Sequence, residues 1–211
     1  IDMIEYIAKT EKKIFLSTGM STFEEIGKAV KRLKKFGNKK ITLLHCVSSY
    51  PAKKEHINLN VLKTLKKKFN LDVGYSDHTI GDEMCLAAVA MGSKVIEKHV
   101  TTSINQRGPD HNASMEFKDF KSMVDKIRKL DVALGSYEKI FSKNELHIKK
   151  VARKSIVTNI ALNKGTKIKR SDLKYKRPGT GISPLNINRI IGKKIKISLK
   201  KNRVLKYKHI K

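Results

Sequence analysis

Val73-Gly-Tyr-Ser-Asp-His-Thr79 and Val95-Ile-Glu-Lys-His-Val-Thr101 are two short β-type segments that each carry a histidine near their end. The residues between them, 81–91, are apolar enough for a buried helix. The order strand, helix, strand is typical of a parallel sheet with right-handed crossovers. Because such sheets place their chemistry at the carboxyl ends of the strands, His78 and His99 are candidate metal ligands at one edge.

The same alternation extends over residues 14–134. We expect strands at 13–19, 41–47, 73–76 and 94–99, and helices near 22–36, 58–69, 81–91 and 116–134. Thr22 and Glu25 have the spacing of a capping box at the start of the first helix. No glycine fingerprint of a dinucleotide-binding sheet follows the first strand. A segment of an eight-stranded α/β barrel therefore fits better than an open sheet.

Composition and segment length change after Gly135, which predicts a second domain. Residues 136–150 are polar and rich in lysine, so we expect a linker there. From residue 151 to 211 the segments are short, and we expect strands within 153–160, 166–173 and 195–199, with a Pro/Gly loop at 178–184. The expected division is thus a barrel-type domain at 1–135, the linker, and a compact domain at 151–211. A domain this small is close to the lower limit for independent stability.

The formal net charge of +28 raises the question of a nucleic-acid partner. Only 8 of the 47 basic residues are Arg, and aromatic residues make up 6% of the chain. Base readout and bidentate phosphate contacts favour Arg, and single-strand binding favours interleaved aromatics. The lysines are spread over the whole chain, as on solvated faces. We therefore expect no specific nucleic-acid partner.

Cysteine usage and hydropathy favour a cytoplasmic protein. Cys46 and Cys85 lie in a strand-like and a helix-like segment, where buried, reduced thiols are the expected state. No apolar run approaches the length of a membrane span, and the first residues do not have the pattern of a signal peptide. We expect no membrane association.

The strand pattern also predicts neighbours for the two histidines. Alternate residues of a strand share a face, so Ser76 lies with His78, and Glu97 with His99. Two imidazoles leave several coordination positions of a metal open, which suits a Lewis-acid role with Glu97 as a supporting partner. The alternative is that each histidine is simply a hydrogen-bonded polar residue at a strand end.

Hydroxyl groups follow the other strands. Ser17-Thr-Gly19, Ser48-Ser-Tyr50 and Ser76 could surround an anion such as phosphate, although turn chemistry explains any one of them equally well. Asp110, in a Gly-Pro-Asp-His loop, could accept hydrogen bonds from substrate hydroxyls. Arg177, beside a glycine-rich turn, could bind an amide or carboxylate oxygen.

Seven motifs occur in order along the chain: Ile14-Phe-Leu-Ser-Thr-Gly-Met20, Leu43-Leu-His-Cys-Val-Ser-Ser-Tyr-Pro51, Gly74-Tyr-Ser-Asp-His-Thr79, Glu97-Lys-His99, Gly108-Pro-Asp-His111, Val151-Ala-Arg-Lys-Ser-Ile-Val157 and Lys176-Arg-Pro-Gly-Thr-Gly-Ile182. On these motifs the chain resembles the sialic acid (N-acetylneuraminate) synthase family over nearly its whole length. The resemblance implies a TIM barrel followed by a small antifreeze-like (SAF) domain. The strands present here correspond to the fifth through eighth, so the chain resembles the C-terminal half of the (β/α)8 barrel plus the SAF domain.

The resemblance implies a transferase that condenses phosphoenolpyruvate with an N-acetylated sugar, such as N-acetylmannosamine, to a nine-carbon 2-keto acid and phosphate. It implies that His78 and His99 hold a divalent metal ion, Mn²⁺ or Mg²⁺. It places Ser17, Ser48 and Ser76 at phosphoenolpyruvate-binding positions. Some members of the family have Asn where this chain has Ser48.

The resemblance also concerns the sugar and the assembly. Tyr50 and Asp110 fall where the sugar is held, and Asp110 joins the two histidines as a catalytic candidate. Arg177 matches the arginine that the SAF domain lends to the neighbouring subunit's site in a domain-swapped homodimer. The family's first four barrel strands have no counterpart here, so we expect the 211-residue chain to be inactive alone. The alternatives are a legionaminic or pseudaminic acid synthase of the same family and a non-catalytic remnant that carries the SAF domain.

Overall fold

The computed structural model describes residues 2–211, and the chain divides into two units, Ile1–Ser136 and Tyr137–Lys211. The first unit is built on a four-stranded sheet whose strands are β1 (Ile14–Ser17), β2 (Ile41–Cys46), β3 (Asp72–Asp77) and β4 (Ile96–Lys98). The strands are parallel and follow each other in the order β1-β2-β3-β4. The expected α/β class with a parallel sheet is confirmed.

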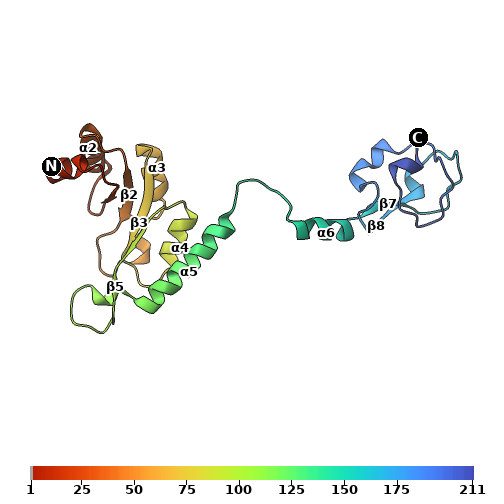
Figure 1. Ribbon diagram of the computed structural model, residues 1–211. Helices are drawn as coiled ribbons and strands as arrows, with labels where there is room; N and C mark the ends of the chain where they lie inside the picture. The colour runs from red at the N-terminus through yellow and green to blue at the C-terminus, as the bar shows by residue number, and fades with distance from the viewer. Residues whose placement is uncertain (1) are drawn as a thin grey trace. The chain divides into compact units, whose positions relative to one another are not determined.

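A helix follows each strand of this sheet. The helices are α2 (Phe23–Lys35), α3 (Val61–Phe69), α4 (Glu83–Ala90) and α5 (Phe117–Leu134). Figure 1 shows β2 and β3 side by side, with α3 and α4 next to them. Each crossover returns the chain to the same end of the sheet, so all four strands end at one edge.

Local sequence explains where α2 begins. The Thr22 hydroxyl accepts a hydrogen bond from the Glu25 N–H at 3.3 Å, and the Glu25 carboxylate accepts one from the Thr22 N–H at 2.7 Å. This is the capping box that the sequence predicts. The helix buries Ile26, Val30 and Leu33 against the sheet side of the unit. Burial of this stripe, more than helix propensity, stabilises the helix in the protein.

Three parts of the first unit differ from the expectation. Helix α1 (Asp2–Lys9) was not expected, and it packs against α2. The fourth strand ends at Lys98, so His99 lies just beyond the sheet. The chain then forms a small separate parallel pair from β5 (Val100–Thr101) and β6 (Met115–Glu116).

The second unit contains a helix and a two-stranded antiparallel ladder. These are α6 (Lys143–Ala152), β7 (Ser155–Thr158) and β8 (Leu173–Lys176). Its core is formed by buried aliphatic residues, among them Ile156, Ile168, Ile182, Ile190 and Leu205.

One expectation for the second unit is wrong in detail. Residues 166–173 and 195–199 form isolated β-bridges and a 3₁₀ turn instead of strands. Ile168 and Ile195 reach the core without belonging to a strand, so the apolar spacing does not require a ladder. Part of the expected linker is α6, whose start is capped by Ser142 and Glu145 through a second capping box.

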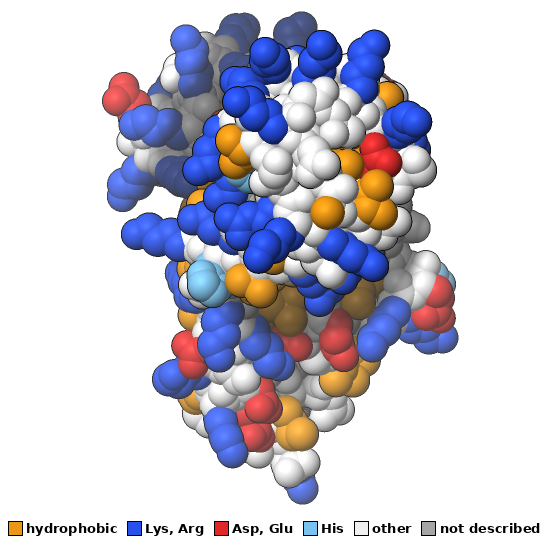
Figure 2. Space-filling view, turned by 90° about the vertical axis from the view of Figure 1, so that its right-hand side faces the viewer, with side chains coloured by type: hydrophobic (Ala, Val, Ile, Leu, Met, Phe, Trp, Pro, Cys, Tyr) orange, Lys and Arg blue, Asp and Glu red, His pale blue; other side chains and the backbone are white. Residues whose placement is uncertain are grey.

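The surface agrees with the expectation that the lysines lie on solvent-exposed faces. Figure 2 shows Lys and Arg side chains over much of the visible face, with few Asp and Glu side chains among them. Among the helices of residues 2–211, none combines the length and the apolar character needed to cross a membrane. Cys46 and Cys85 are free thiols; Cys85 is buried as expected, whereas Cys46 is half-buried at the end of β2.

Candidate functional site

The carboxyl ends of three strands bring three aromatic rings together. His78 and His99 are the residues directly after β3 and β4, and their ring centroids are 5.0 Å apart. The Tyr50 ring, from the loop after β2, lies 4.3 Å from the His78 ring and 5.6 Å from the His99 ring. The structure therefore brings Tyr50 into one cluster with the two histidines, which the sequence predicts to lie at one edge of the sheet.

His78 is oriented for ligation by its backbone surroundings. Its Nδ1 lies 3.1 Å from the Val47 carbonyl oxygen. Because a carbonyl oxygen only accepts, we assign the hydrogen to Nδ1, which leaves the lone pair on Nε2. Burial lowers the pKa of His78 and nearby His99 adds to this effect, while the Val47 carbonyl opposes it; the net pKa lies below the ordinary value. The neutral form, which is the form that binds metals, is thus favoured.

The histidine pair offers two ligands to a metal ion. In the part of the chain that the structure describes, no group of three or more His, Cys, Asp or Glu side chains could hold a metal ion. Asp110 Oδ2 lies 4.0 Å from His99 Nδ1, so this carboxylate sits beside the histidine pair. Two imidazoles fit a divalent ion that takes its remaining ligands from water, substrate or another segment.

Two cross-strand contacts lie directly behind the histidines. Ser76 Oγ donates a 2.7 Å hydrogen bond to Glu97 Oε1, as the shared strand face predicts. Lys98 Nζ donates a 2.7 Å hydrogen bond to Asp77 Oδ2, and both side chains are almost fully buried. Burial alone would raise the pKa of Asp77, but hydrogen bonds from Lys98 and Thr79 outweigh it and hold the pKa below its ordinary value.

Sequence reasoning did not single out the Asp77–Lys98 ion pair. A signal was present, because opposite charges stand at the last positions of two adjacent strands. The strand register pairs them directly. Only the register of β3 against β4, which cannot be read from the sequence, shows that these two charges meet.

The other predicted anion-binding residues surround the ends of β1 and β2. Ser17 is exposed at the end of β1, and Ser48 is half-buried after β2. A Cβ added to Gly19 would lie only 2.3 Å from Ser48 Oγ, so the two strand ends are in direct contact. Ser76 is buried, with its hydroxyl on Glu97. The roles of the three serines in anion binding stay predictions.

Arg177 belongs to the second unit. It is exposed and precedes Pro178, whose carbonyl oxygen accepts a 2.6 Å hydrogen bond from Ser155 Oγ. The same Ser155 oxygen accepts a 2.8 Å hydrogen bond from the Gly181 N–H. The buried serine thus closes the loop that presents Arg177, whose contact with a sugar stays a prediction.

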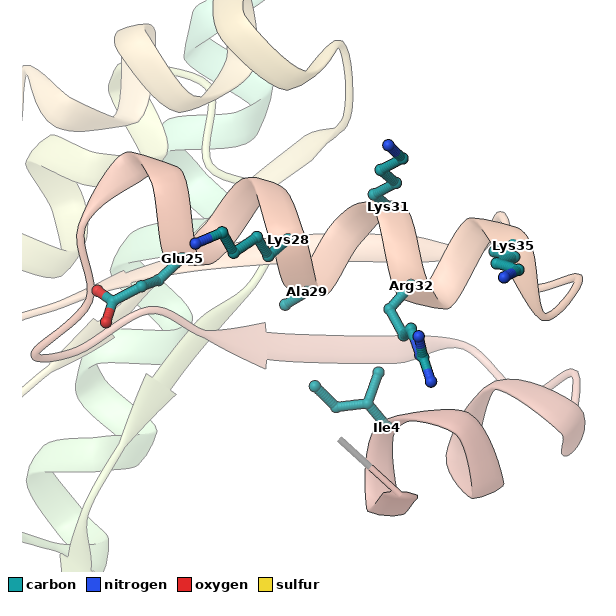
Figure 3. A pocket seen from close by; sticks show the side chains of 7 residues that line it. All are labelled: Ile4, Glu25, Lys28, Ala29, Lys31, Arg32 and Lys35. Carbon is teal, nitrogen blue, oxygen red and sulfur yellow. The ribbon is translucent and has the colours of Figure 1, made fainter.

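A separate pocket lies between α1 and α2 (Figure 3). Its walls are formed by Ile4, Glu25, Lys28, Ala29, Lys31, Arg32 and Lys35. It shares no residue with the histidine cluster. Its position on the outer helices separates it from the strand ends, so it is not part of the candidate site.

Comparison with known proteins matches both units. A model of the NeuB family matches residues 1–139, and a model of the SAF domain matches residues 153–211. The chain is 45% identical over 192 residues to N,N'-diacetyllegionaminic acid synthase of Campylobacter jejuni, across 90% of this chain and 58% of that protein. It is 36% identical over 202 residues to pseudaminic acid synthase of Helicobacter pylori, across 96% of this chain and 59% of that protein.

A solved structure agrees with the sequence relatives. The N-acetylneuraminic acid (sialic acid) synthetase of Leptospira borgpetersenii, in complex with citrate, superposes with a TM-score of 0.64 at 36% identity. The match covers 69% of this chain and 51% of that one. The chain spans less than two thirds of the length of the curated relatives that it matches.

Proposed function

Because this chain belongs to the NeuB family and carries a SAF domain, we propose that it is part of a synthase that condenses phosphoenolpyruvate with an N-acetylated sugar. The products are a nine-carbon 2-keto acid and phosphate. The observation that carries the proposal is the convergence of His78, His99 and Tyr50 at the strand ends. A pair of imidazoles beside a phenol is suited to holding a divalent ion next to a sugar.

The proposed roles follow from where each side chain lies. His78 and His99 hold the divalent ion, Mn²⁺ or Mg²⁺, through imidazole nitrogen. A bound ion would supply Lewis acidity toward the sugar's aldehyde oxygen. Tyr50, whose ring packs on both histidines, orients the sugar, and exposed Asp110 accepts hydrogen bonds from its hydroxyls.

The phosphoenolpyruvate side of the site is proposed at the ends of the first three strands. Ser17, Ser48 and Ser76 offer hydroxyls to the phosphate and carboxylate groups. The chain's high positive charge favours the approach of such an anion. Water at C2 of the condensed intermediate would then release phosphate by C–O cleavage.

The relatives favour a legionaminic acid precursor as a second candidate for the sugar substrate. Identity is 45% to the diacetyllegionaminic acid synthase and 36% to both the pseudaminic acid synthase and the sialic acid synthetase. We therefore propose N-acetylmannosamine-type sugars as the general substrate class, and a legionaminic acid precursor as the more specific alternative. Sugar discrimination needs pocket walls that this chain supplies only in part.

The length of the match bears on activity. The first unit contributes a four-stranded parallel sheet, and an eight-stranded barrel has twice that number. We propose that β1–β4 are the fifth to eighth barrel strands, and that the remaining strands complete the site. On this proposal the chain is inactive alone, acts in the cytoplasm, and forms a domain-swapped homodimer in which Arg177 serves the neighbouring site.

The test uses the chain joined to the preceding half of the Campylobacter jejuni synthase. Sugar-dependent release of phosphate from phosphoenolpyruvate is measured with Mn²⁺ and a panel of N-acetylated sugars. We expect His78→Ala and His99→Ala to abolish release, and His56→Ala, an exposed histidine of the same unit, to leave it unchanged. A folded, joined chain that releases no phosphate with any sugar would favour the non-catalytic remnant instead.

A further inference from the structure

Two consecutive residue pairs join the ends of β3 and β4, and a histidine follows each strand. Ser76 is in register with Glu97 and Asp77 with Lys98, and the next residue on each strand is His78 or His99. Side chains alternate between the two faces of a sheet, so the Asp77–Lys98 pair lies on the face opposite to Ser76 and Glu97. The ion pair is thus the covalent neighbour of both histidines without occupying their face.

Lys98 forms hydrogen bonds with the residues on both sides of His78 in the chain. Its Nζ donates one hydrogen bond to the Asp77 carboxylate and a second one to the Thr79 carbonyl oxygen. These two acceptors belong to the residues directly before and after His78. Since Lys98 itself directly precedes His99, a single side chain connects the backbone around one histidine with the backbone of the other.

The Asp77 carboxylate completes this clamp. Its Oδ1 accepts hydrogen bonds from the Thr79 N–H and the Tyr75 hydroxyl, both at 2.9 Å. Its Oδ2 accepts further ones from the Thr79 hydroxyl at 3.2 Å and the Cys85 thiol at 3.1 Å. A rotation of the peptide units around His78 would break several of these contacts together. The turn that aims the imidazole therefore has one favoured shape.

Such a buried ion pair affects the local geometry more than the net stability. The Lys98 and Asp77 side chains are 1% and 0% exposed, so both charges have left water. Buried ion pairs often add little net stability over well-packed apolar residues, because desolvation offsets the attraction. What the pair does define is a single alignment of β3 against β4, since any slip would bury each charge alone.

We propose that Asp77 and Lys98 are positioning residues, whose ion pair holds His78 and His99 in the mutual orientation in which both imidazoles reach one divalent cation. The proposal rests on the metal site of the proposed function. It goes beyond the ligands themselves, because neither residue touches the cation. On this proposal, the orientation of the two histidines is fixed by residues on the opposite face of the sheet.

The test removes both charges together. In Asp77→Asn/Lys98→Met the shapes are nearly kept, the Asn oxygen still accepts from Thr79 and Tyr75, and no charge is left buried alone. We expect this double variant of the 211-residue chain to stay folded, as followed by circular dichroism and urea unfolding. We expect its Mn²⁺ affinity, measured from the loss of the free-ion electron paramagnetic resonance signal, to fall about 10- to 100-fold. Wild-type affinity in the folded double variant would overturn the proposal.

Two comparisons separate positioning from general damage. Lys121→Met/Asp125→Asn removes an ion pair of the same composition from the exposed face of α5, and its Mn²⁺ affinity should equal that of wild type. The single variant Lys98→Met should unfold at lower urea than the double variant, because it leaves the Asp77 carboxylate buried without its cation. A loss of Mn²⁺ binding in the α5 variant as well would point to a general effect of removing an ion pair and would overturn the proposal.

A crystal structure of Asp77→Asn/Lys98→Met gives a readout that needs no metal. We expect the two imidazole rings to leave their 5.0 Å arrangement. Rings that keep this arrangement would overturn the positioning role whatever the metal titration shows. If the wild-type chain binds no Mn²⁺ through His78 and His99, the proposed metal function fails, and the crystallographic comparison still decides the positioning role.

Discussion

The Ser76 hydroxyl donates a 2.7 Å hydrogen bond to the Glu97 carboxylate, across the junction of β3 and β4. Ser76 is 2% exposed, so its hydroxyl has little access to other partners. A serine hydroxyl has one hydrogen to donate. Ser76 can therefore donate to a bound phosphate only when Glu97 gives up this contact. Glu97 therefore competes with phosphoenolpyruvate for the Ser76 hydroxyl, which is predicted to bind that substrate.

A double-mutant cycle measures this coupling. We expect Ser76→Ala and Glu97→Ala each to destabilise the first unit, and the pair to be coupled by about 1 kcal/mol, as for a hydrogen bond that is only partly buried. Urea unfolding of the two single variants and the double variant gives the coupling free energy. Strictly additive losses would mean that the contact contributes nothing to stability.

Gly74 lies in β3 where a larger residue cannot fit. A Cβ there would lie 2.5 Å from Leu44 Cδ2 and 2.7 Å from the Val95 carbonyl oxygen. Because the backbone oxygen cannot move away cheaply, we expect Gly74→Ala to lower the free energy of unfolding by about 1–3 kcal/mol. Thermal or urea unfolding measures the loss.

Gly27 in α2 is the matched control for this substitution. A Cβ there would meet only Phe69 Cε1 at 3.6 Å, which is an ordinary contact. Gly27→Ala should therefore stabilise the helix by about 0.5–1 kcal/mol. Equal effects of the two substitutions would show that space at Gly74 is not the limiting factor.

His45 should make the first unit sensitive to acid. Burial lowers the pKa of His45 below its ordinary value of 6.5, and a 2.6 Å hydrogen bond to the Ile57 carbonyl oxygen only partly opposes this. Below pH 6.5 the unfolded chain binds a proton that the folded chain does not, so stability is lost as the pH falls from there toward the folded pKa. The slope for one proton is at most about 1.4 kcal/mol per pH unit.

His45→Gln keeps an N–H donor for the Ile57 carbonyl oxygen but cannot titrate. We expect its free energy of unfolding to depend less on pH than that of wild type as the pH falls below 6.5, the ordinary histidine value. The comparison variant is His209→Gln, because His209 also has a lowered pKa but lies in the second unit. An unchanged acid slope of the first unit in His45→Gln would contradict the assignment.

Ser155 should control the loop that carries Arg177. Its buried hydroxyl donates to the Pro178 carbonyl oxygen and accepts from the Gly181 N–H. We expect Ser155→Ala to destabilise the second unit by about 1–2 kcal/mol, because the half-buried Gly181 N–H and the Pro178 carbonyl oxygen both lose their partner. Hydrogen exchange of the Gly181 amide should accelerate at the same time.

Ser198→Ala is the control for the loop. The Ser198 hydroxyl accepts from the Lys164 N–H at an exposed position, where water can replace it. We expect a change within about 0.5 kcal/mol and unchanged exchange at Gly181. If both serine variants loosen the Arg177 loop alike, the loop is not held by Ser155 in particular.

Much of the first unit could be predicted because its signals are local and repeated. The stripe Ile26, Val30 and Leu33, with the capping box at Thr22, is sufficient to place α2. The buried run of β2 is typical of a parallel strand covered on both faces. The second unit was predicted less well, since its isoleucines reach the core from turns and single bridges, which have no period to read.

The candidate site shows the same division. The positions of His78 and His99 after adjacent parallel strands made their approach predictable, and the structure brings their rings together. Tyr50 was expected at a strand end from the sequence, but its role beside the sugar was expected only from the family resemblance. The Asp77–Lys98 pair was missed, because a charge near a strand end usually points to solvent, and nothing local distinguishes one that is buried.

By itself, the sequence determined the alternation of strands and helices, the strand ends that carry the histidines, and the family to which the chain belongs. These depend on periodicity, capping and motifs, which act over a few neighbouring residues. The tertiary structure alone decided which side chains meet: Ser76 with Glu97, Asp77 with Lys98, and Tyr50 with both histidines. The physical reason for the first two pairs is strand register, since a shift of β4 against β3 by one residue would turn Glu97 and Lys98 away from their partners. Tyr50 reaches the histidines from the loop after β2, whose path the strand pattern does not fix.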